Sequence, residues 1–156
     1  MTVKKHRYQA TVTWTGNQGT GTSHYHAYSR DHLIQAPLKA AIKGSSDAAF
    51  LGDASRWNPE ELLLASASAC HKLWYLHLCA EAGVCVLSYV DQVTGTMVEV
   101  PSGPGAFTEI TLHPEIVISD EATIDLALSL HHKAHELCYI ANSFNFPVHC
   151  EPIVKA

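Results

Sequence analysis

The sequence feature that most constrains the fold is a long helix signal between Asn58 and Gly83. Asn58 is a favoured N-cap residue, and Pro59 suits the first helical position because its φ angle is already close to the helical value. Glu61 stands at the capping-box position, where its side chain can bond back to the backbone of the cap. Gly83 tolerates the left-handed conformation that ends many helices. We therefore expect one helix of about 25 residues, or about 37 Å.

This helix is apolar on nearly every side. Between Leu62 and Ala82 only Lys72 and Glu81 carry a charge, whereas a surface helix normally has one polar face. The sequence therefore predicts a buried central helix. The chain length favours a single domain, residues 1–156, and a domain of that size has difficulty covering every face of such a helix. Burial against a second copy, in a homodimer, is the economical expectation.

Strand patterns precede the helix. Apolar and polar residues alternate from Tyr8 to Trp14, which is typical of a half-buried strand. A glycine-rich turn follows and predicts a returning strand over about 23–28, with a short third strand near 33–36. We expect the first third of the chain to form a small antiparallel sheet.

More strands and a second helix are expected after the central helix. Two β-rich runs, 84–100 and 107–119, are joined by a Pro/Gly cluster that suggests a hairpin. Acidic residues followed by spaced apolar residues indicate a helix from Glu121 to about Asn142. A last strand is expected over 148–154. This order, with antiparallel hairpins, favours an α+β fold over a parallel α/β fold.

Composition excludes several classes of function. The formal net charge is -5, so the chain presents no basic field for nucleic acid or an anionic membrane. The sequence has no run of about 18 apolar residues for a bilayer, and residues 1–7 are not followed by an apolar signal segment. We expect a cytoplasmic protein. Its five cysteines are odd in number and form no CxxC motif, which disfavours a disulfide scaffold and a zinc finger.

Two motifs carry a resemblance to a known family. The run Asn58-Pro-Glu-Glu-Leu-Leu-Leu-Ala-Ser-Ala-Ser-Ala-Cys70 is followed, at a distance, by Ala134-His-Glu-Leu-Cys138. Together they resemble the active-site motifs of the OsmC/Ohr family of thiol peroxidases, in its OsmC-like subgroup, and the element order is similar along essentially the whole chain. The resemblance implies an OsmC-like fold, with antiparallel sheets packed around two central helices in an intertwined homodimer. Tyr139 replaces the proline that commonly follows the second cysteine in the best-known hydroperoxide reductases.

The resemblance also implies a role for each cysteine of the pair. Cys70 would be the peroxidatic thiolate that attacks an organic hydroperoxide, or hydrogen peroxide, in oxidative-stress defence. Cys138 would resolve the resulting sulfenic acid as a disulfide. A dithiol reductant such as a lipoyl protein would regenerate both thiols. No cofactor, resident metal, nucleic acid or membrane partner is implied. We interpret the other cysteines, Cys79, Cys85 and Cys150, as packing residues.

In the family, a glutamate and an arginine assist the peroxidatic cysteine. Glu60 matches the glutamate, but ten residues of continuous helix separate it from Cys70 by about 15 Å along the axis and about 280° around it. Either the first helical turn is detached, or Glu60 of one subunit lies beside Cys70 of the other, as in the family's shared sites. For the arginine we select Arg30, at a tight connection after the expected second strand. Arg56, near the Asn-Pro-Glu motif, is the alternative.

A competing hypothesis comes from the histidines, which number 11. His131, His135 and Cys138 lie at positions i, i+4 and i+7, so one helix face could offer two imidazoles and a thiolate to Zn²⁺. His71 or Cys70 could supply a fourth ligand. The sequence therefore also allows a zinc-binding protein or, on the same fold, a non-catalytic thiol sensor.

Overall fold

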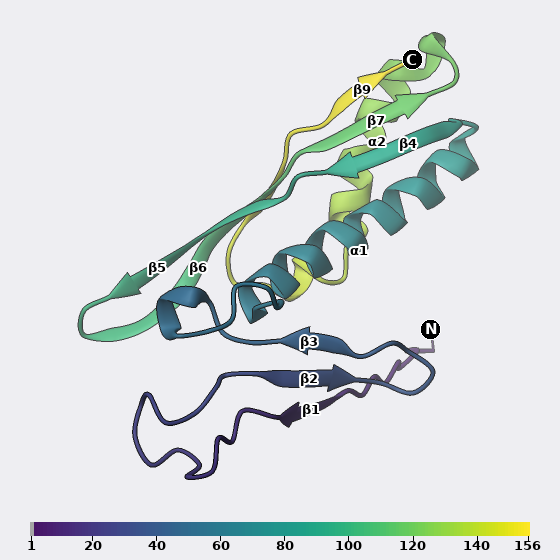
Figure 1. Cartoon of the computed structure of the whole chain (residues 1–156). Coiled ribbons are helices and arrows are strands. Elements are labelled where there is room, and N and C mark those ends of the chain that lie inside the picture. Colours follow the sequence, from purple (N-terminus) through teal and green to yellow (C-terminus); the bar gives the residue numbers. More distant parts are fainter. Residues whose placement is uncertain (1) are drawn as a thin grey trace. The chain divides into compact units, whose positions relative to one another are not determined.

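The computed structural model describes residues 2–156. Within those residues it contains two α-helices and three three-stranded sheets, which confirms the expected mixture of helices and strands. The chain divides into two compact units, one up to Leu62 and one from Leu63 to Ala156. Figure 1 labels the elements of both units.

The first unit is built on a small antiparallel sheet in the order β1-β2-β3. Its strands are β1 (Thr11–Trp14), β2 (His32–Gln35) and β3 (Ile42–Gly44), and a 3₁₀ turn follows at Ala48–Phe50. The expected N-terminal sheet is therefore confirmed, but the strand expected over 23–28 is wrong. That segment lies in the long connection between β1 and β2, where the chain makes turns instead of a ladder. The strand expected to be third is the one that pairs with β1.

The sheet of the first unit has no apolar core of its own. Among the described residues of this unit, only Gly16, Gly44 and Ser45 are buried, while Val12 and Trp14 of β1 are exposed. A three-stranded sheet needs an apolar face packed against another element to be stable. The first unit therefore does not bury enough apolar surface to account for its own order.

Helix α1 (Pro59–Ala82) matches the prediction at both ends. The Glu61 amide donates to Asn58 Oδ1 at 2.8 Å, and the Asn58 amide donates to Glu61 Oε2 at 3.2 Å, so the capping box forms in both directions. Gly83 follows with a φ of 77°, in the left-handed region. The helix is unbroken throughout, so the detached first turn considered for Glu60 is not observed.

The six strands of the second unit form two sheets that continue one another. Only Gln92 and Val93 separate β4 (Val86–Asp91) from β5 (Thr94–Val100), and only His113 separates β6 (Gly103–Leu112) from β7 (Pro114–Ile118). The expected hairpin of two β-rich runs is therefore confirmed. The expected last strand is split at Glu151 and Pro152, and its halves run parallel to their neighbours, so the sheets are mixed and not purely antiparallel. One sheet has the strand order β4-β7-β9, in which β9 is Ile153–Lys155. The other has the order β5-β6-β8, in which β8 is Val148–Cys150.

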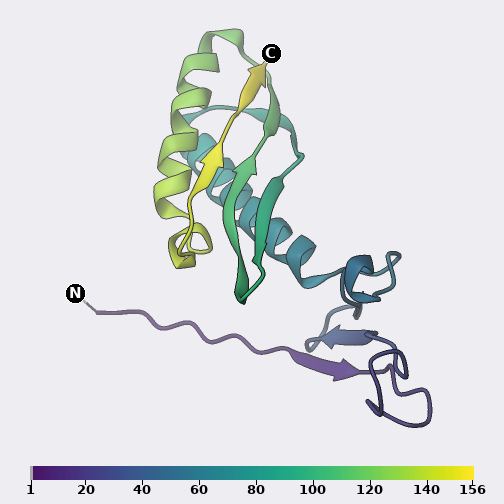
Figure 2. The same ribbon diagram turned by 90° about the vertical axis from the view of Figure 1, so that its left-hand side faces the viewer.

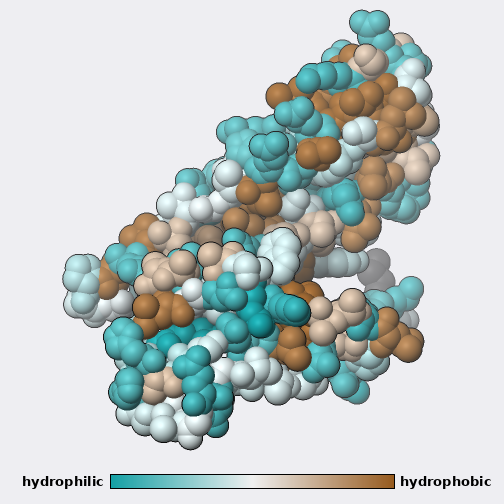
Figure 3. Space-filling model, viewed as in Figure 1, coloured by the Kyte–Doolittle hydropathy of each residue, from teal (hydrophilic) through white to brown (hydrophobic). Residues whose placement is uncertain are grey.

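Helix α1 is buried along one stripe instead of on every side. Its buried positions are Ala67, His71, Tyr75 and Cys79, each four residues apart, whereas Leu73 is 63% exposed. The expectation of burial all round is therefore wrong for a single chain. Figure 3 shows apolar side chains, in brown, over the region where Figure 1 places β4 and the C-terminal half of α1. No helix among residues 2–156 combines the length and apolar character needed to cross a bilayer.

Helix α2 (Ile124–Leu137) ends earlier than expected. It follows a 3₁₀ turn at Glu121–Thr123, and the prediction extended it to about residue 142. Cys138 instead has an extended backbone, with a ψ of 106°, and a further 3₁₀ turn follows at Ala141–Ser143. Cys138 therefore lies just beyond the helix and not on its face.

Both helices contribute to one core with strand β7. Tyr75 of α1 packs in a cluster with Ile116 and Ile118 of β7 and with alanines of α2. The Tyr75 hydroxyl also donates to the Ala127 carbonyl of α2 at 3.1 Å. Figures 1 and 2 show β4, β7 and β9 side by side, with the two helices next to them.

Two buried histidines join the helices of the second unit. His71 of α1 is 1% exposed and His131 of α2 is 3% exposed, and a hydrogen bond of 3.0 Å links His71 Nε2 and His131 Nδ1. Burial lowers the pKa of His71 to about 4 and that of His131 to about 3, and a neighbouring histidine acts in the same direction on each. Both rings are therefore neutral at pH 7.

These two histidines predict a loss of stability in mild acid. In the unfolded chain both histidines become protonated near pH 6.5. In the folded chain His71 becomes protonated only near pH 4 and His131 only near pH 3. Their contribution is therefore present above pH 6.5 and is lost as the pH falls toward the folded values. We expect each buried histidine to lower the free energy of unfolding by about 2 kcal/mol between pH 7 and pH 5.

Urea unfolding at the two pH values measures this loss. The His131→Gln variant should lose about 2 kcal/mol less than the wild type over the same interval. His132→Gln, at the neighbouring exposed position, is the control and should keep the wild-type pH dependence. Identical pH dependence in the two variants would contradict the prediction.

Candidate functional site

The structure brings Cys70 and Cys138 together. Cys70 lies on α1 and is half-buried, while Cys138 lies just after α2 and is 1% exposed. The two side chains lie close enough for Cys70 to contribute to the raised pKa of Cys138, and all five cysteines of the chain are free thiols. A thiol that solvent can reach, in contact with a covered one, forms a pair that can be oxidised to a disulfide.

The early end of α2 positions Cys138. Beyond the extended Cys138 backbone the chain turns into the 3₁₀ segment Ala141–Ser143. The backbone amides of Ile140 and Ala141 act on the Cys138 thiol and oppose the rise of its pKa, and the Asn142 amide donates to the Cys138 carbonyl at 3.0 Å. The thiol is thus held by a short turn and not by a helix face.

Burial makes Cys138 a weak acid. It raises the pKa of this thiol to about 11; the adjacent Cys70 acts in the same direction, and the Ala141 amide opposes it. At neutral pH Cys138 is therefore protonated. Because the thiolate is the nucleophilic form, the more exposed Cys70 is the better candidate for a first attack on a substrate.

Asp91 fixes the position of α1 beside the pair. Its Oδ2 accepts a hydrogen bond from Ser68 Oγ, two residues before Cys70, and its Oδ1 accepts one from the His113 amide at 2.7 Å. One carboxylate therefore ties the reactive stretch of the helix to the junction between the two sheets. Sequence analysis missed Asp91, because a single acidic residue at the end of a strand forms no motif.

Aromatic side chains accompany the cysteine pair. Trp74 follows Cys70 by one helical turn, and Tyr139 follows Cys138 directly. The two rings meet edge to face, with centroids 5.6 Å apart, and Tyr139 is exposed. An apolar surface at the pair suits an organic substrate.

Glu60 and Arg30, expected to assist the cysteines, lie in the first unit. Glu60 is half-buried in the first turn of α1. The Arg30 guanidinium donates to the Tyr25 and Tyr28 carbonyls, each at 2.6 Å, and lies over both tyrosine rings. Arg30 is therefore held firmly within its own loop.

Arg56, the alternative arginine, has a different environment. Its Nε forms ion pairs with Asp31 at 3.3 Å and with Asp53 at 3.5 Å. Its Nη1 is buried and has no hydrogen-bond partner among residues 2–156, and a hollow of about 250 Å³ lies beside it. One terminal guanidinium nitrogen of Arg56 therefore lacks a protein partner among the described residues, whereas both terminal nitrogens of Arg30 are engaged.

The expected zinc triad of His131, His135 and Cys138 is wrong. Because α2 ends at Leu137, Cys138 does not share a helix face with the two histidines, and it contacts Cys70 instead. His135 is half-buried. Residues at i, i+4 and i+7 share one face only where all of them belong to the same helix.

The remaining cysteines have three different environments. Cys79 packs in the core, which confirms its interpretation as a packing residue. Cys85 is exposed, so that interpretation is wrong for this residue. Cys150 lies beside the buried imidazoles of His71 and His131, and these three form the one group of converging ligand atoms that the described part of the chain contains. Its members come from three elements, so no sequence spacing indicates it.

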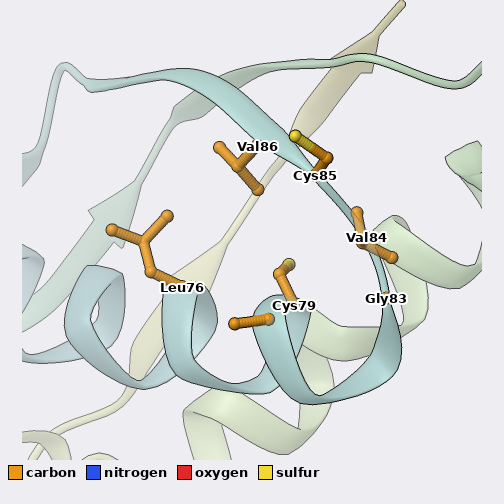
Figure 4. Close-up of a pocket in the computed structure, with 7 residues that line it drawn as sticks. Leu76, Cys79, Gly83, Val84, Cys85 and Val86 are labelled. Carbon is orange, nitrogen blue, oxygen red and sulfur yellow. The ribbon is translucent and has the colours of Figure 1, made fainter.

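A separate hollow lies at the C-terminal end of α1 (Figure 4). It has a volume of about 420 Å³, and its lining includes Leu76, Cys79, Gly83 and Val86. None of its lining residues is charged, and burial raises the pKa of Cys79. It contains no member of the cysteine pair and no acid or base for catalysis.

Solved structures share the fold of this chain. An OsmC-like protein of unknown function from Vibrio cholerae aligns with a TM-score of 0.86 at 30% identity, covering 96% of this chain and 100% of that chain. An organic hydroperoxide resistance protein from Elizabethkingia anophelis aligns at 0.66 and 19% identity, covering 97% and 99%. An organic hydroperoxide resistance protein OsmC from Legionella pneumophila aligns at 0.64 and 16%, covering 97% and 100%. The last two show a common fold alone. No curated protein sequence matches this chain.

A family model described as OsmC-like protein matches residues 52–152. The matched segment includes Cys70 and Cys138 and crosses the boundary between the two units. With the Vibrio cholerae structure, it confirms the OsmC-like fold that the two motifs implied. The chain therefore belongs to the OsmC-like protein family.

Proposed function

We propose that this protein is a cysteine-based peroxidase that reduces organic hydroperoxides through Cys70 and Cys138. The observation that carries the proposal is the contact between an accessible thiol on α1 and a covered thiol after α2. Membership of the OsmC-like family supports it, since solved proteins of the same fold are named organic hydroperoxide resistance proteins.

In the first step, the Cys70 thiolate attacks one oxygen of the peroxide. A sulfur–oxygen bond forms and the O–O bond breaks, so two electrons pass from sulfur to the peroxide and Cys70 becomes a sulfenic acid. The leaving alkoxide takes a proton from solvent and departs as an alcohol. Cys138, protonated because of its raised pKa, does not compete for the peroxide.

In the second step, Cys138 attacks the sulfenic acid on Cys70. A disulfide bond forms, the sulfur–oxygen bond breaks, and the oxygen leaves as water with the thiol proton. The amides of Ile140 and Ala141 lower the pKa of Cys138 and so favour negative charge on its sulfur as the proton departs. A dithiol reductant, such as a lipoyl protein of the cytoplasm, then restores both thiols by exchange.

The surroundings of the pair favour organic hydroperoxides over hydrogen peroxide. The apolar group of an organic peroxide gains roughly 25 cal/mol for each Å² that it buries. The rings of Trp74 and Tyr139 offer such a surface near the two cysteines. Hydrogen peroxide has no apolar group to bury.

We also propose a homodimer whose subunits share each site. Apolar side chains of β1, including Val12 and Trp14, are exposed, as is Leu73 of α1, and covering them with a second copy removes apolar surface from water. Glu60 precedes Cys70 by ten residues on an unbroken helix, or by about 15 Å. We therefore assign Glu60 to the cysteine of the partner subunit.

Replacement of either cysteine tests the division of roles. Cys70→Ser should abolish turnover of cumene hydroperoxide, because no nucleophile remains. Cys138→Ser should react once per chain and leave a sulfenic acid on Cys70. Stopped-flow peroxide consumption and mass spectrometry after dimedone labelling measure both outcomes. The exposed Cys85→Ser is the matched control and should keep the wild-type rate.

Equal peroxide consumption by the wild type and Cys70→Ser would remove Cys70 from its role. The same assay with tert-butyl hydroperoxide and hydrogen peroxide tests the substrate preference. Faster turnover of hydrogen peroxide than of both organic peroxides would contradict it.

Two matched variants separate the candidate arginines. We expect Arg30→Met to lower kcat/KM for cumene hydroperoxide about 10²-fold, because the peroxide oxygen loses a cation that stabilises its developing charge. Arg56→Met removes the same charge, and thermal unfolding shows whether each variant folds. Near-normal turnover in Arg30→Met, with a loss in Arg56→Met, would move the role to Arg56 and its unpartnered Nη1.

Mixed dimers test whether Glu60 acts across subunits. Glu60→Gln and Cys70→Ser should each be nearly inactive alone. After the two variants are mixed and exchanged, each mixed dimer holds one intact site if Glu60 acts across the interface, so activity should recover to about a quarter of the wild-type value. Analytical ultracentrifugation verifies the dimer. A mixture that stays inactive despite subunit exchange would place both residues of a site in one chain.

A further inference from the structure

A cluster of three side chains outside the cysteine pair joins three elements of the second unit. His71 comes from α1, His131 from α2 and Cys150 from β8. Besides the 3.0 Å between the two ring nitrogens, Cys150 Sγ lies 3.7 Å from His71 Nε2 and 3.9 Å from His131 Nδ1. The proposed peroxidase chemistry uses none of these groups.

The separations of these three atoms match those around a metal ion. A tetrahedral Zn²⁺ with two imidazole ligands and one thiolate holds the nitrogens about 3.3 Å apart and the sulfur about 3.6 Å from each. The point in the plane of the three atoms that is equidistant from them lies about 2.1 Å from each, close to the lengths of Zn–N and Zn–S bonds. We propose that His71, His131 and Cys150 form a zinc-binding site with one open coordination position.

The chemistry of the donors suits a borderline-soft divalent cation. Two nitrogens and one sulfur are ligands that suit Zn²⁺ better than they suit Mg²⁺ or Ca²⁺, which favour oxygen ligands. A neutral imidazole offers one nitrogen lone pair to a metal ion, so each of the two rings can supply one ligand atom. The Asp91 carboxylate acts electrostatically on both His71 and Cys150, and its negative charge favours a cation at this place.

Binding requires two proton movements. Cys150 would bind Zn²⁺ as a thiolate, so binding releases the one thiol proton to solvent. The two rings lie within 5° of parallel and share one N–H. This hydrogen moves to the distal nitrogen of its own ring, and the rings turn toward Cys150. The distal nitrogens, His71 Nδ1 and His131 Nε2, have no partner among the described residues that would hold either tautomer.

The cluster has a path to solvent. A hollow of about 330 Å³ is lined by His131, His135 and Cys150, among others. It admits the ion and leaves room for a water molecule at the fourth position. A bound ion would fasten α1, α2 and β8 to one point. The proposed peroxidase reaction uses none of these ligands. The zinc site can therefore be tested independently of the proposed function.

Zinc binding to the tag-free, reduced protein is the first test. Titration calorimetry in two buffers of different ionisation enthalpy should show one Zn²⁺ per chain and the release of one proton. X-ray absorption at the zinc edge should show one sulfur, two imidazole nitrogens and one further light atom. Binding well below one ion per chain, or a bound ion without sulfur, would overturn the proposal.

Variants of the ligands test which residues hold the ion. Cys150→Ser and His131→Gln should each weaken zinc binding by more than about 100-fold, because loss of a direct ligand costs more than loss of a supporting contact. The exposed Cys85→Ser and His132→Gln are matched controls and should bind as the wild type does. Wild-type affinity in Cys150→Ser would overturn the assignment, and the absorption spectrum of the wild type tests it even if that variant does not fold.

Two further variants separate this cluster from other thiols and imidazoles. Cys138→Ser removes the buried thiol of the redox pair, and His135→Ala removes the other imidazole beside the hollow. Both should retain stoichiometric zinc. Loss of zinc in Cys138→Ser, with retention in Cys150→Ser, would place the ion at the redox pair and overturn the proposal.

Discussion

The rotational position of α1 decides which side chain of the second unit reacts and which is buried. Successive residues of a helix are turned by about 100°, so the buried stripe through His71 and Tyr75 places Cys70 at the margin, where it is half-buried. The Tyr75 hydroxyl, bonded to α2, and Ser68, bonded to Asp91, hold this position from two sides. A turn of one residue that buried the Cys70 thiol would move His71 out of the buried stripe, to the half-buried position of Lys72. The packing of the core and the position of the reactive pair therefore both depend on the same rotation of α1 about its axis.

Local signals in the sequence predicted α1 but not the end of α2. Asn58 and Glu61 bond to each other whatever the rest of the chain does, and Gly83 needs only its own conformational freedom, so these ends follow from nearby residues. The end of α2 has no such residue, because no glycine or proline stands between Leu137 and Asn142. There the chain leaves the helix as Cys138 packs against Cys70, a contact between residues far apart in the sequence. Tertiary contacts of this kind override local helix preference.

The candidate site was predictable to the extent that motifs carry it. The two motifs named both Cys70 and Cys138, and the structure places these thiols in contact. The histidine spacing predicted the wrong cluster, because it grouped His131 with residues farther along its own helix. The imidazole in fact meets His71 and Cys150, which come from other elements. A cluster assembled from α1, α2 and β8 has no fixed spacing along the chain, so only the folded arrangement reveals it.

The sheet of the first unit has a consequence for the order in which the chain acquires structure. Residues up to Leu62 leave the ribosome before the second unit does, yet their sheet buries no large apolar side chain. Ordering its backbone costs about 1–2 kcal/mol per residue, and little burial within the sheet offsets that cost. The later residues contain the buried clusters around Tyr75 and Ile110, so they can collapse without help. We therefore expect the first unit to become ordered after the second unit, although it precedes it along the chain, and until then its strands remain open to chaperones and proteases.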